Sequence, residues 1–223
     1  MTLRNRRFPG LSRATLLALL VLGAFAAVAA AATITGGPGP DLLLGTPNAD
    51  LINGNGGNDV IFANGGNDKV SGNADADLLH GGSGNDQISG DDGNDTIFGD
   101  GLTVSCMTGA NAMNYLIYCS VSPSTSPGDD TITGGNGTDD IHGGAGDDVI
   151  DGGMGNDTIA GDSGNDVISG SSGNDTIDGD GGNDTINVRD NQIDTVVCGS
   201  GTDTVTADKN DVVAGDCEHV SRK

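Results

Sequence analysis

Aspartates recur along this chain at a fixed step of nine residues. Each is followed two positions later by leucine, isoleucine or valine, as in Asp157-Thr158-Ile159, and preceded by a glycine-rich stretch such as residues 152–155. One carboxylate per unit, beside flexible turns that aim backbone carbonyls at it, supplies the oxygen-rich donor set that Ca²⁺ accepts more readily than Mg²⁺. We therefore expect repeated cation sites. The candidate ligands are Asp41, Asp50, Asp59, Asp68, Asp77, Asp86, Asp95, Asp130, Asp139, Asp148, Asp157, Asp166, Asp175 and Asp184.

The elements that position these aspartates are expected to be short strands and turns. An x-U-x stretch, with U a large aliphatic residue, is too short for a helix but suits a strand with one side chain facing inward. The glycines supply turns with positive φ. Two units make one circuit, so alternate aspartates lie on the same edge, one strand spacing apart. Like charges that close repel unless a cation lies between them.

The unit G-G-x-G-x-D-x-U-x resembles the RTX (repeats-in-toxin, hemolysin-type) calcium-binding nonapeptide repeat. Seven whole units fill residues 36–98, six fill 134–187, and one more is split by an insertion. The resemblance implies an all-β, right-handed parallel β-roll (a β-solenoid) in which the repeat aspartates and turn carbonyls bind Ca²⁺.

The number of sites follows from the stacking of units. Each unit stacks on the second unit after it, so fourteen units allow up to about twelve Ca²⁺ sites between circuits. Asp50 and Asp77 are expected to be weaker ligands, because units 45–53 and 72–80 lack glycines at turn positions. Folding is expected to be coupled to calcium binding. The alternative is a solvated acidic edge without metal.

The N-terminal segment predicts export. Residues 1–32 carry four arginines and no acid, then an apolar run ending in alanines, which is the layout of a secretory signal peptide. An uncleaved membrane anchor is the alternative. Removal of this segment would change the net charge from −23 to −27. That charge excludes nucleic acid as a partner. We expect an extracellular, secreted protein that does not contact the membrane after cleavage and is monomeric, with cell-surface association as a further option.

The remaining chain divides into a β-roll over 33–187, an inserted loop over 101–127, and degenerate repeats with a C-terminal cap over 188–223. An even number of cysteines in an exported chain predicts disulfides, with three possible connectivities. Closeness in sequence favours Cys106–Cys119 and Cys198–Cys217, the first stapling a hairpin in the insertion. A zinc site is the alternative, although C-x-x-C spacing is absent.

No catalytic constellation is recognisable, so we expect no enzyme. His80 and His142 are expected to be surface residues two circuits apart, too far to share a metal. Repeat threonines leave gaps that argue against a flat ice-binding face. Two functions remain: an exported calcium-binding β-roll, or a surface adhesion or interaction protein in which calcium rigidifies the scaffold and the insertion binds a surface or matrix partner.

Overall fold

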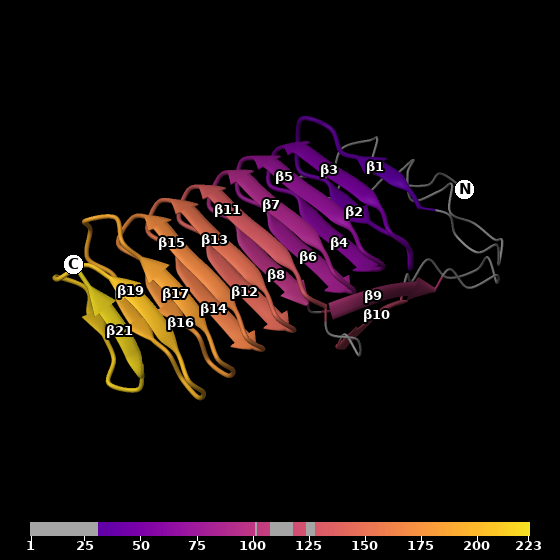
Figure 1. The fold of residues 1–223 in the computed structure, drawn as a ribbon. Coiled ribbons are helices and arrows are strands. Elements are labelled where there is room, and N and C mark those ends of the chain that lie inside the picture. Colours follow the sequence, from indigo (N-terminus) through magenta and orange to yellow (C-terminus); the bar gives the residue numbers. More distant parts are fainter. Residues whose placement is uncertain (1–30, 101, 108–117, 124–127) are drawn as a thin grey trace, which may run out of the picture.

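The computed structural model describes residues 31–100, 102–107, 118–123 and 128–223. All but the last two residues of the predicted signal peptide (1–32) lie outside this part. Within this part, successive strands alternate between two parallel sheets, so the chain winds into an elongated roll (Figure 1). A third, two-stranded sheet lies beside the roll near its N-terminal half. The predicted all-β parallel solenoid is confirmed.

Each sheet collects every second strand of the roll. The first sheet contains β1 (Thr33–Thr35), β3 (Leu51–Gly56), β5 (Lys69–Ala74), β7 (Gln87–Asp92), β11 (Thr131–Asn136), β13 (Val149–Met154), β15 (Val167–Ser172), β17 (Thr185–Val188), β19 (Thr204–Ala207) and β21 (His219–Arg222). The second contains β2 (Leu42–Leu44), β4 (Val60–Gly65), β6 (Leu78–Ser83), β8 (Thr96–Asp100), β12 (Asp140–Ala145), β14 (Thr158–Ser163), β16 (Thr176–Asp178), β18 (Thr195–Val197) and β20 (Val212–Val213).

The hydrophobic core is a stack of single aliphatic side chains, one from each repeat. In β14, Ile159 is buried, while Thr158 before it is exposed and Ala160 after it is half-buried, because side chains alternate across a strand. Parallel pairing aligns Ile159 with Ile141 and Ile177 on the neighbouring strands. The same repeat position is buried in Leu43, Ile52, Ile61, Val70, Leu79, Ile88, Ile97, Ile132, Ile150, Ile168, Ile186, Val196 and Val205.

The insertion leaves the register of the roll intact. Strand β7 pairs directly with β11, and β8 with β12, across the inserted residues. The insertion itself forms the antiparallel pair β9 (Leu102–Met107) and β10 (Tyr118–Pro123), in which Cys106 lies opposite Cys119. Directly opposed residues have Cα atoms about 4.5–5.5 Å apart, within the range of a disulfide. The Cys106–Cys119 bond stays a prediction that this register favours.

The two sheets continue through residues 188–223, where degenerate repeats and a cap were predicted. Strands β18 and β20 continue the second sheet, and β19 and β21 continue the first. The Asp-x-aliphatic pattern explains the extension, because it persists at 194–196, 203–205 and 211–213 despite irregular spacing. The predicted Cys198–Cys217 disulfide is present in these last circuits.

The prediction that His80 is a surface residue is wrong, because its exposed fraction is only 6%. Its ring stacks between Phe62 and Phe98, with centroid distances of 4.8 and 4.6 Å, and Phe98 stacks on His142 at 5.1 Å. All four share the last position of alternate repeats, so parallel pairing aligns them. Strand β9 lies against β4 and β6, which carry Phe62 and His80. Burial lowers the pKa of His80 to about 4.

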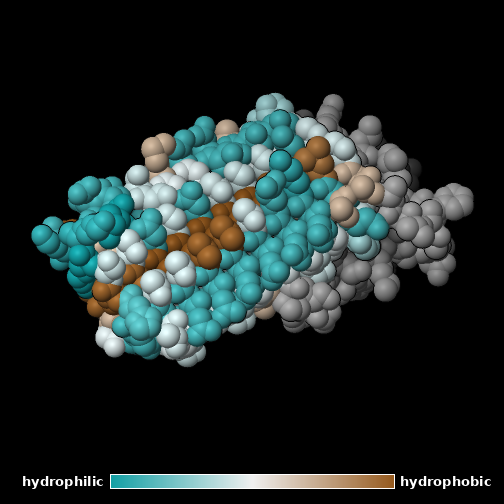
Figure 2. Space-filling model, in the orientation of Figure 1, coloured by the Kyte–Doolittle hydropathy of each residue, from teal (hydrophilic) through white to brown (hydrophobic). Residues whose placement is uncertain are grey.

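The outer surface is mainly hydrophilic. Figure 2 shows one face, on which hydrophilic residues surround a narrow lengthwise band of hydrophobic ones. In the described residues no helix is long and apolar enough to cross a membrane. Large hydrophobic residues that are exposed are Leu51, Val149, Met154, Val167, Ile193, Val212 and Val220.

Turn geometry gives a first testable prediction. Gly155 has φ +139°, and a Cβ placed there would overlap the carbonyl oxygen of Gly137 in the preceding circuit. We expect Gly155→Ala to lower the free energy of unfolding in calcium by more than about 1 kcal/mol, because alanine fits neither the backbone conformation nor the space. Gly215→Ala is the matched control, since a Cβ there meets nothing within 4 Å. Denaturant unfolding that gives equal stabilities for both variants would contradict the turn geometry.

Candidate metal centre

All fourteen repeat aspartates are buried, and the structure brings them together in two ladders, one along each edge of the roll. One Oδ1 oxygen links each circuit to the preceding one. The backbone N–H of Asp139 donates to Asp157 Oδ1 at 2.9 Å, and that of Asp157 donates to Asp175 Oδ1 at 2.9 Å. The second ladder has the same contact between Asp148 and Asp166, at 2.8 Å. The ladder crosses the insertion unbroken, since Asp86 N–H donates to Asp130 Oδ1 at 2.6 Å.

The other carboxylate oxygen, Oδ2, has no hydrogen-bond partner in most repeats, although it is buried. This holds for Asp59, Asp68, Asp77, Asp86, Asp95, Asp130, Asp139, Asp148, Asp157, Asp166, Asp175 and Asp184. A buried carboxylate oxygen without a partner is costly, since folding removes its water. Without a bound metal ion, the aspartate ladders therefore leave one hydrogen-bond acceptor without a partner in almost every turn.

A glycine at the first position of the unit makes the space that this oxygen faces in all of these repeats but one, the unit that begins with Ala63. A Cβ placed on Gly152 would lie 2.7 Å from Asp157 Oδ2 and 2.9 Å from the carbonyl oxygen of Gly170 in the next circuit. Because glycine has no Cβ, a carboxylate oxygen and a carbonyl oxygen from adjacent circuits adjoin the same small volume. The same arrangement recurs at Gly161, where Asp166 Oδ2 and the Gly179 carbonyl lie 2.5 and 2.9 Å from the added Cβ.

Burial raises the pKa of the ladder aspartates, and neighbouring carboxylates raise it further. The pKa of Asp166 is raised to about 7, by desolvation first and by Asp148 and Asp184, against the lowering effect of the hydrogen bond from Asp148 N–H. The pKa of Asp130 reaches about 8 for the same reasons, with Asp86, Asp148 and Asp100 as the neighbouring charges. Without a cation, the ladders therefore disfavour charge at neutral pH.

The two N-terminal aspartates differ from the rest. Asp41 Oδ2 accepts a hydrogen bond from Gly37 N–H, and Asp50 Oδ2 accepts one from Thr46 N–H, both at 2.5 Å and both within the aspartate's own turn. Asp77, expected to be weak like Asp50, instead has the unpartnered Oδ2 of the regular repeats. The glycine losses in its turn are accommodated by Asn73 and Asp75, both with positive φ.

Three further aspartates join the ladders but were not among the predicted ligands. Asp175 N–H donates to Asp194 Oδ1, and Asp184 N–H donates to Asp203 Oδ1, each at 2.8 Å. Asp194 N–H donates to Asp211 Oδ1 at 3.3 Å. The Asp-x-Val pattern was the available signal, obscured by irregular spacing.

Asp100 was also missed as a site residue. It precedes the insertion, and its Oδ2 accepts hydrogen bonds from Gly128 N–H at 3.3 Å and Ala145 N–H at 3.1 Å. Its Oδ1 is buried and has no hydrogen-bond partner. The carboxylate thereby closes the turn that the insertion interrupts, and its charge raises the pKa of the neighbouring Asp130 and Asp148.

Comparison with known protein families agrees with this geometry. The family model of the RTX calcium-binding nonapeptide repeat matches four segments, residues 35–70, 71–101, 124–159 and 151–186, which together cover more than half of the chain. The chain belongs to the RTX calcium-binding repeat family. RTX repeats bind calcium through a β-roll, a structural fold that is not typically catalytic. No curated protein matches this chain.

The residues present fit calcium. Carboxylate and carbonyl oxygens are hard donors, and flexible turns suit the irregular coordination of Ca²⁺. Among the described residues, no group of three or more His, Cys, Asp or Glu side chains is arranged to hold a metal ion. Most turns nevertheless offer a buried carboxylate oxygen without a hydrogen-bond partner beside a backbone carbonyl, as at Asp157 and Gly170. Calcium bound there would supply the positive charge that the ladders lack.

The raised pKa values predict the pH dependence of the metal-free chain. Folded aspartates with pKa values of about 6 to 8 hold protons that the unfolded chain, with an ordinary value of 3.8, releases. The resulting stability is fully present below about pH 4 and is lost as pH rises through 6 to 8. In a chelator, circular dichroism should therefore show strand signal decreasing between pH 4 and pH 8. Saturating calcium should abolish this decrease, and a metal-free strand signal that grows with pH would contradict the assignment.

Proposed function

We propose that this protein is an exported, non-catalytic calcium-binding β-roll whose folding is coupled to the occupation of its aspartate ladders. The observation that carries the proposal is the run of buried Oδ2 atoms without hydrogen-bond partners, repeated from Asp59 to Asp184. Except at Asp68, whose unit begins with Ala63, each of these oxygens lies beside a glycine whose missing side chain leaves room for an ion.

The charge of the chain supports the coupling of folding to metal. The sequence has a formal net charge of −23, and the ladders concentrate aspartates in stacked circuits. Self-repulsion of that size opposes a compact state, and divalent cations between the circuits neutralise it. Binding to the folded roll, and not to the extended chain, then stabilises the fold by mass action. Up to about twelve ions, one between each pair of stacked units, follow from the repeat count.

The layout of residues 1–32 supports export as part of the proposal. RTX repeat proteins are typically secreted. Calcium outside cells suits weak sites of the extracellular class, with Kd values of about 10⁻⁴ to 10⁻³ M. Calcium would then bind to the ladders only after secretion, so the protein would fold outside the cell and not inside it.

Calcium titration of the chain without residues 1–32 tests the proposal. We expect little strand signal in chelator at pH 7.5 and a cooperative gain of strand signal as calcium is added, together with several bound ions per molecule by calorimetry or equilibrium dialysis. Identical circular dichroism spectra with and without calcium, or no bound ions, would refute it.

Matched variants connect the titration to the ladder. Asp157→Asn removes the charge of a buried ladder carboxylate but keeps an oxygen that can accept the hydrogen bond from Asp139 N–H. It should reduce the number of bound ions by at least one. Asp151→Asn, at the exposed last position of the preceding repeat, should bind as many ions as the unmodified chain.

The alternative function, adhesion through the insertion, has one supporting observation: β9 and β10 form a sheet of their own outside the two sheets of the roll. Deletion of residues 101–127 tests it. If calcium is the function, the deletion variant should keep its calcium stoichiometry and any surface attachment of the protein. Loss of attachment with unchanged stoichiometry would favour adhesion instead.

A further inference from the structure

The two sheets have different outer faces in the first circuits of the roll. In each strand, the residues before and after the buried aliphatic residue face outward, because side chains alternate across a strand. These outward residues are mostly polar in β1, β3, β5 and β7, where Leu51 is the exception, but mostly apolar in β2, β4, β6 and β8 of the same circuits. The outer apolar face of the second sheet consists of Leu42, Leu44, Val60, Phe62, Leu78 and Phe98.

The burial of the outer apolar face differs from that of equivalent positions elsewhere in the roll. The position before the buried aliphatic residue is half-buried in β2, β4, β6 and β8, from Leu42 to Thr96. The same position is exposed in the five later strands of this sheet, from Asp140 to Val212, and in every strand of the first sheet. Since strands are paired in parallel throughout the roll, the difference indicates that a further part of the chain lies over this face.

The insertion lies beside the same circuits. It leaves the roll after Asp100, at the end of β8, which is the last of the four strands that carry the outer apolar face. From there β9 lies against β4 and β6, and the β9–β10 hairpin runs beside the N-terminal half of the roll (Figure 1). The hairpin is therefore close to the strands whose outward residues are apolar and half-buried.

The register of the hairpin gives it two sides of different polarity. Directly opposed residues of an antiparallel pair share a side, and the sides alternate along each strand. One side includes the opposed polar pair Ser105 and Ser120. An isolated two-stranded hairpin is marginally stable in water, so burial of its other, apolar side stabilises it. This apolar side consists of the opposed residues Leu102 and Pro123, Val104 and Val121, and Cys106 and Cys119.

We propose that the β9–β10 hairpin docks through its apolar side on the outer apolar face of the second sheet. The insertion is then a built-in cover of the roll, and its apolar side is not available to a partner. Soluble monomers rarely expose large contiguous apolar patches, and docking removes two such surfaces from water at once. The inference does not rest on the proposed function, because it requires the folded roll but no particular ion.

Hydroxyl-radical footprinting read by mass spectrometry tests the docking, because the radical labels side chains according to their exposure. The chain without residues 1–32, in saturating calcium, is compared with the variant Val104→Asp/Val121→Asp. This variant places two charges on the apolar side of the hairpin, where burial without partners is costly. Labelling of Phe62 and Phe98 should rise at least about twofold as the half-buried rings become exposed.

The matched control is Ser105→Asp/Ser120→Asp, which adds the same two charges at opposed positions on the polar side of the hairpin. It should leave the labelling of Phe62 and Phe98 as it is in the unmodified chain. If the two variants label these rings equally, the proposal is overturned.

Deletion of residues 101–127 is a second test, and it does not depend on the fold of the hairpin. The roll can close without the insertion, because β7 pairs with β11 and β8 with β12 across it. In calcium, labelling of Phe62 should rise, while Met154, which is 60% exposed on the first sheet, serves as the unchanged reference. Sedimentation velocity should show self-association at concentrations where the unmodified chain does not associate. Unchanged labelling of Phe62 overturns the proposal. If labelling rises when the unmodified chain is diluted, a second copy covers the face and the proposal also fails.

Discussion

The structure depends on a buried carboxylate oxygen that has no partner within the protein. Burial of an anion without a counter-charge is among the most costly arrangements in a folded chain. Here it is repeated in every regular turn, with Oδ1 consumed by the hydrogen bond between circuits and Oδ2 left over, as at Asp148 and Asp166. A single such group could be tolerated as local strain. A ladder of them favours bound cations, and this supports the proposal that folding and calcium binding are coupled in this chain.

Glycine links the turn to the metal site. The first glycine of a unit, such as Gly152, is needed because a Cβ would occupy the space between the carboxylate and the carbonyl of the next circuit. The fourth, such as Gly155, is needed because its φ is positive and the preceding circuit is in contact with it. A side chain at the first glycine therefore fills the space for an ion, whereas a side chain at the fourth glycine prevents one circuit from stacking on the next. One repeat motif thus encodes both the coil and its ligand set.

Sequence periodicity was sufficient for the architecture, because the aspartate and aliphatic positions each recur with a strict step. It predicted the two ladders, the isoleucine stack and the uninterrupted register across the insertion. It failed where a contact depends on another part of the chain. His80 is buried through stacking with Phe62 and Phe98 and through the nearby insertion strand β9, none of which is visible in a single repeat. Asp203 was missed because the step from Asp184 to Asp194 is ten residues, which shifts Asp194 and Asp203 out of phase with the earlier repeats.

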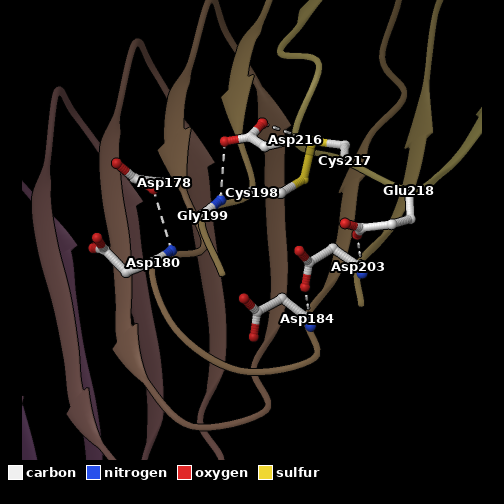
Figure 3. The surroundings of a disulfide bond; sticks show 9 residues. All are labelled: Asp178, Asp180, Asp184, Cys198, Gly199, Asp203, Asp216, Cys217 and Glu218. Carbon is white, nitrogen blue, oxygen red and sulfur yellow. Dashed lines mark hydrogen bonds between the residues drawn. A yellow bond between two sulfur atoms is a disulfide. The ribbon is translucent and has the colours of Figure 1, made fainter. Parts of the chain in front are cut away.

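The two ends of the described roll satisfy their aspartates by different means. At the N-terminal end, Asp41 and Asp50 Oδ2 accept hydrogen bonds from their own turns, so neither oxygen needs an ion to be satisfied. At the C-terminal end, Asp203 Oδ2 remains unpartnered, and a disulfide with a sequence separation of 19 residues holds the adjacent strand in place. Such a crosslink lowers the chain entropy lost on folding. The end of the roll can therefore retain this unsatisfied carboxylate although only one more short strand, β21, is stacked on β19, because the disulfide adds a covalent link to that packing (Figure 3).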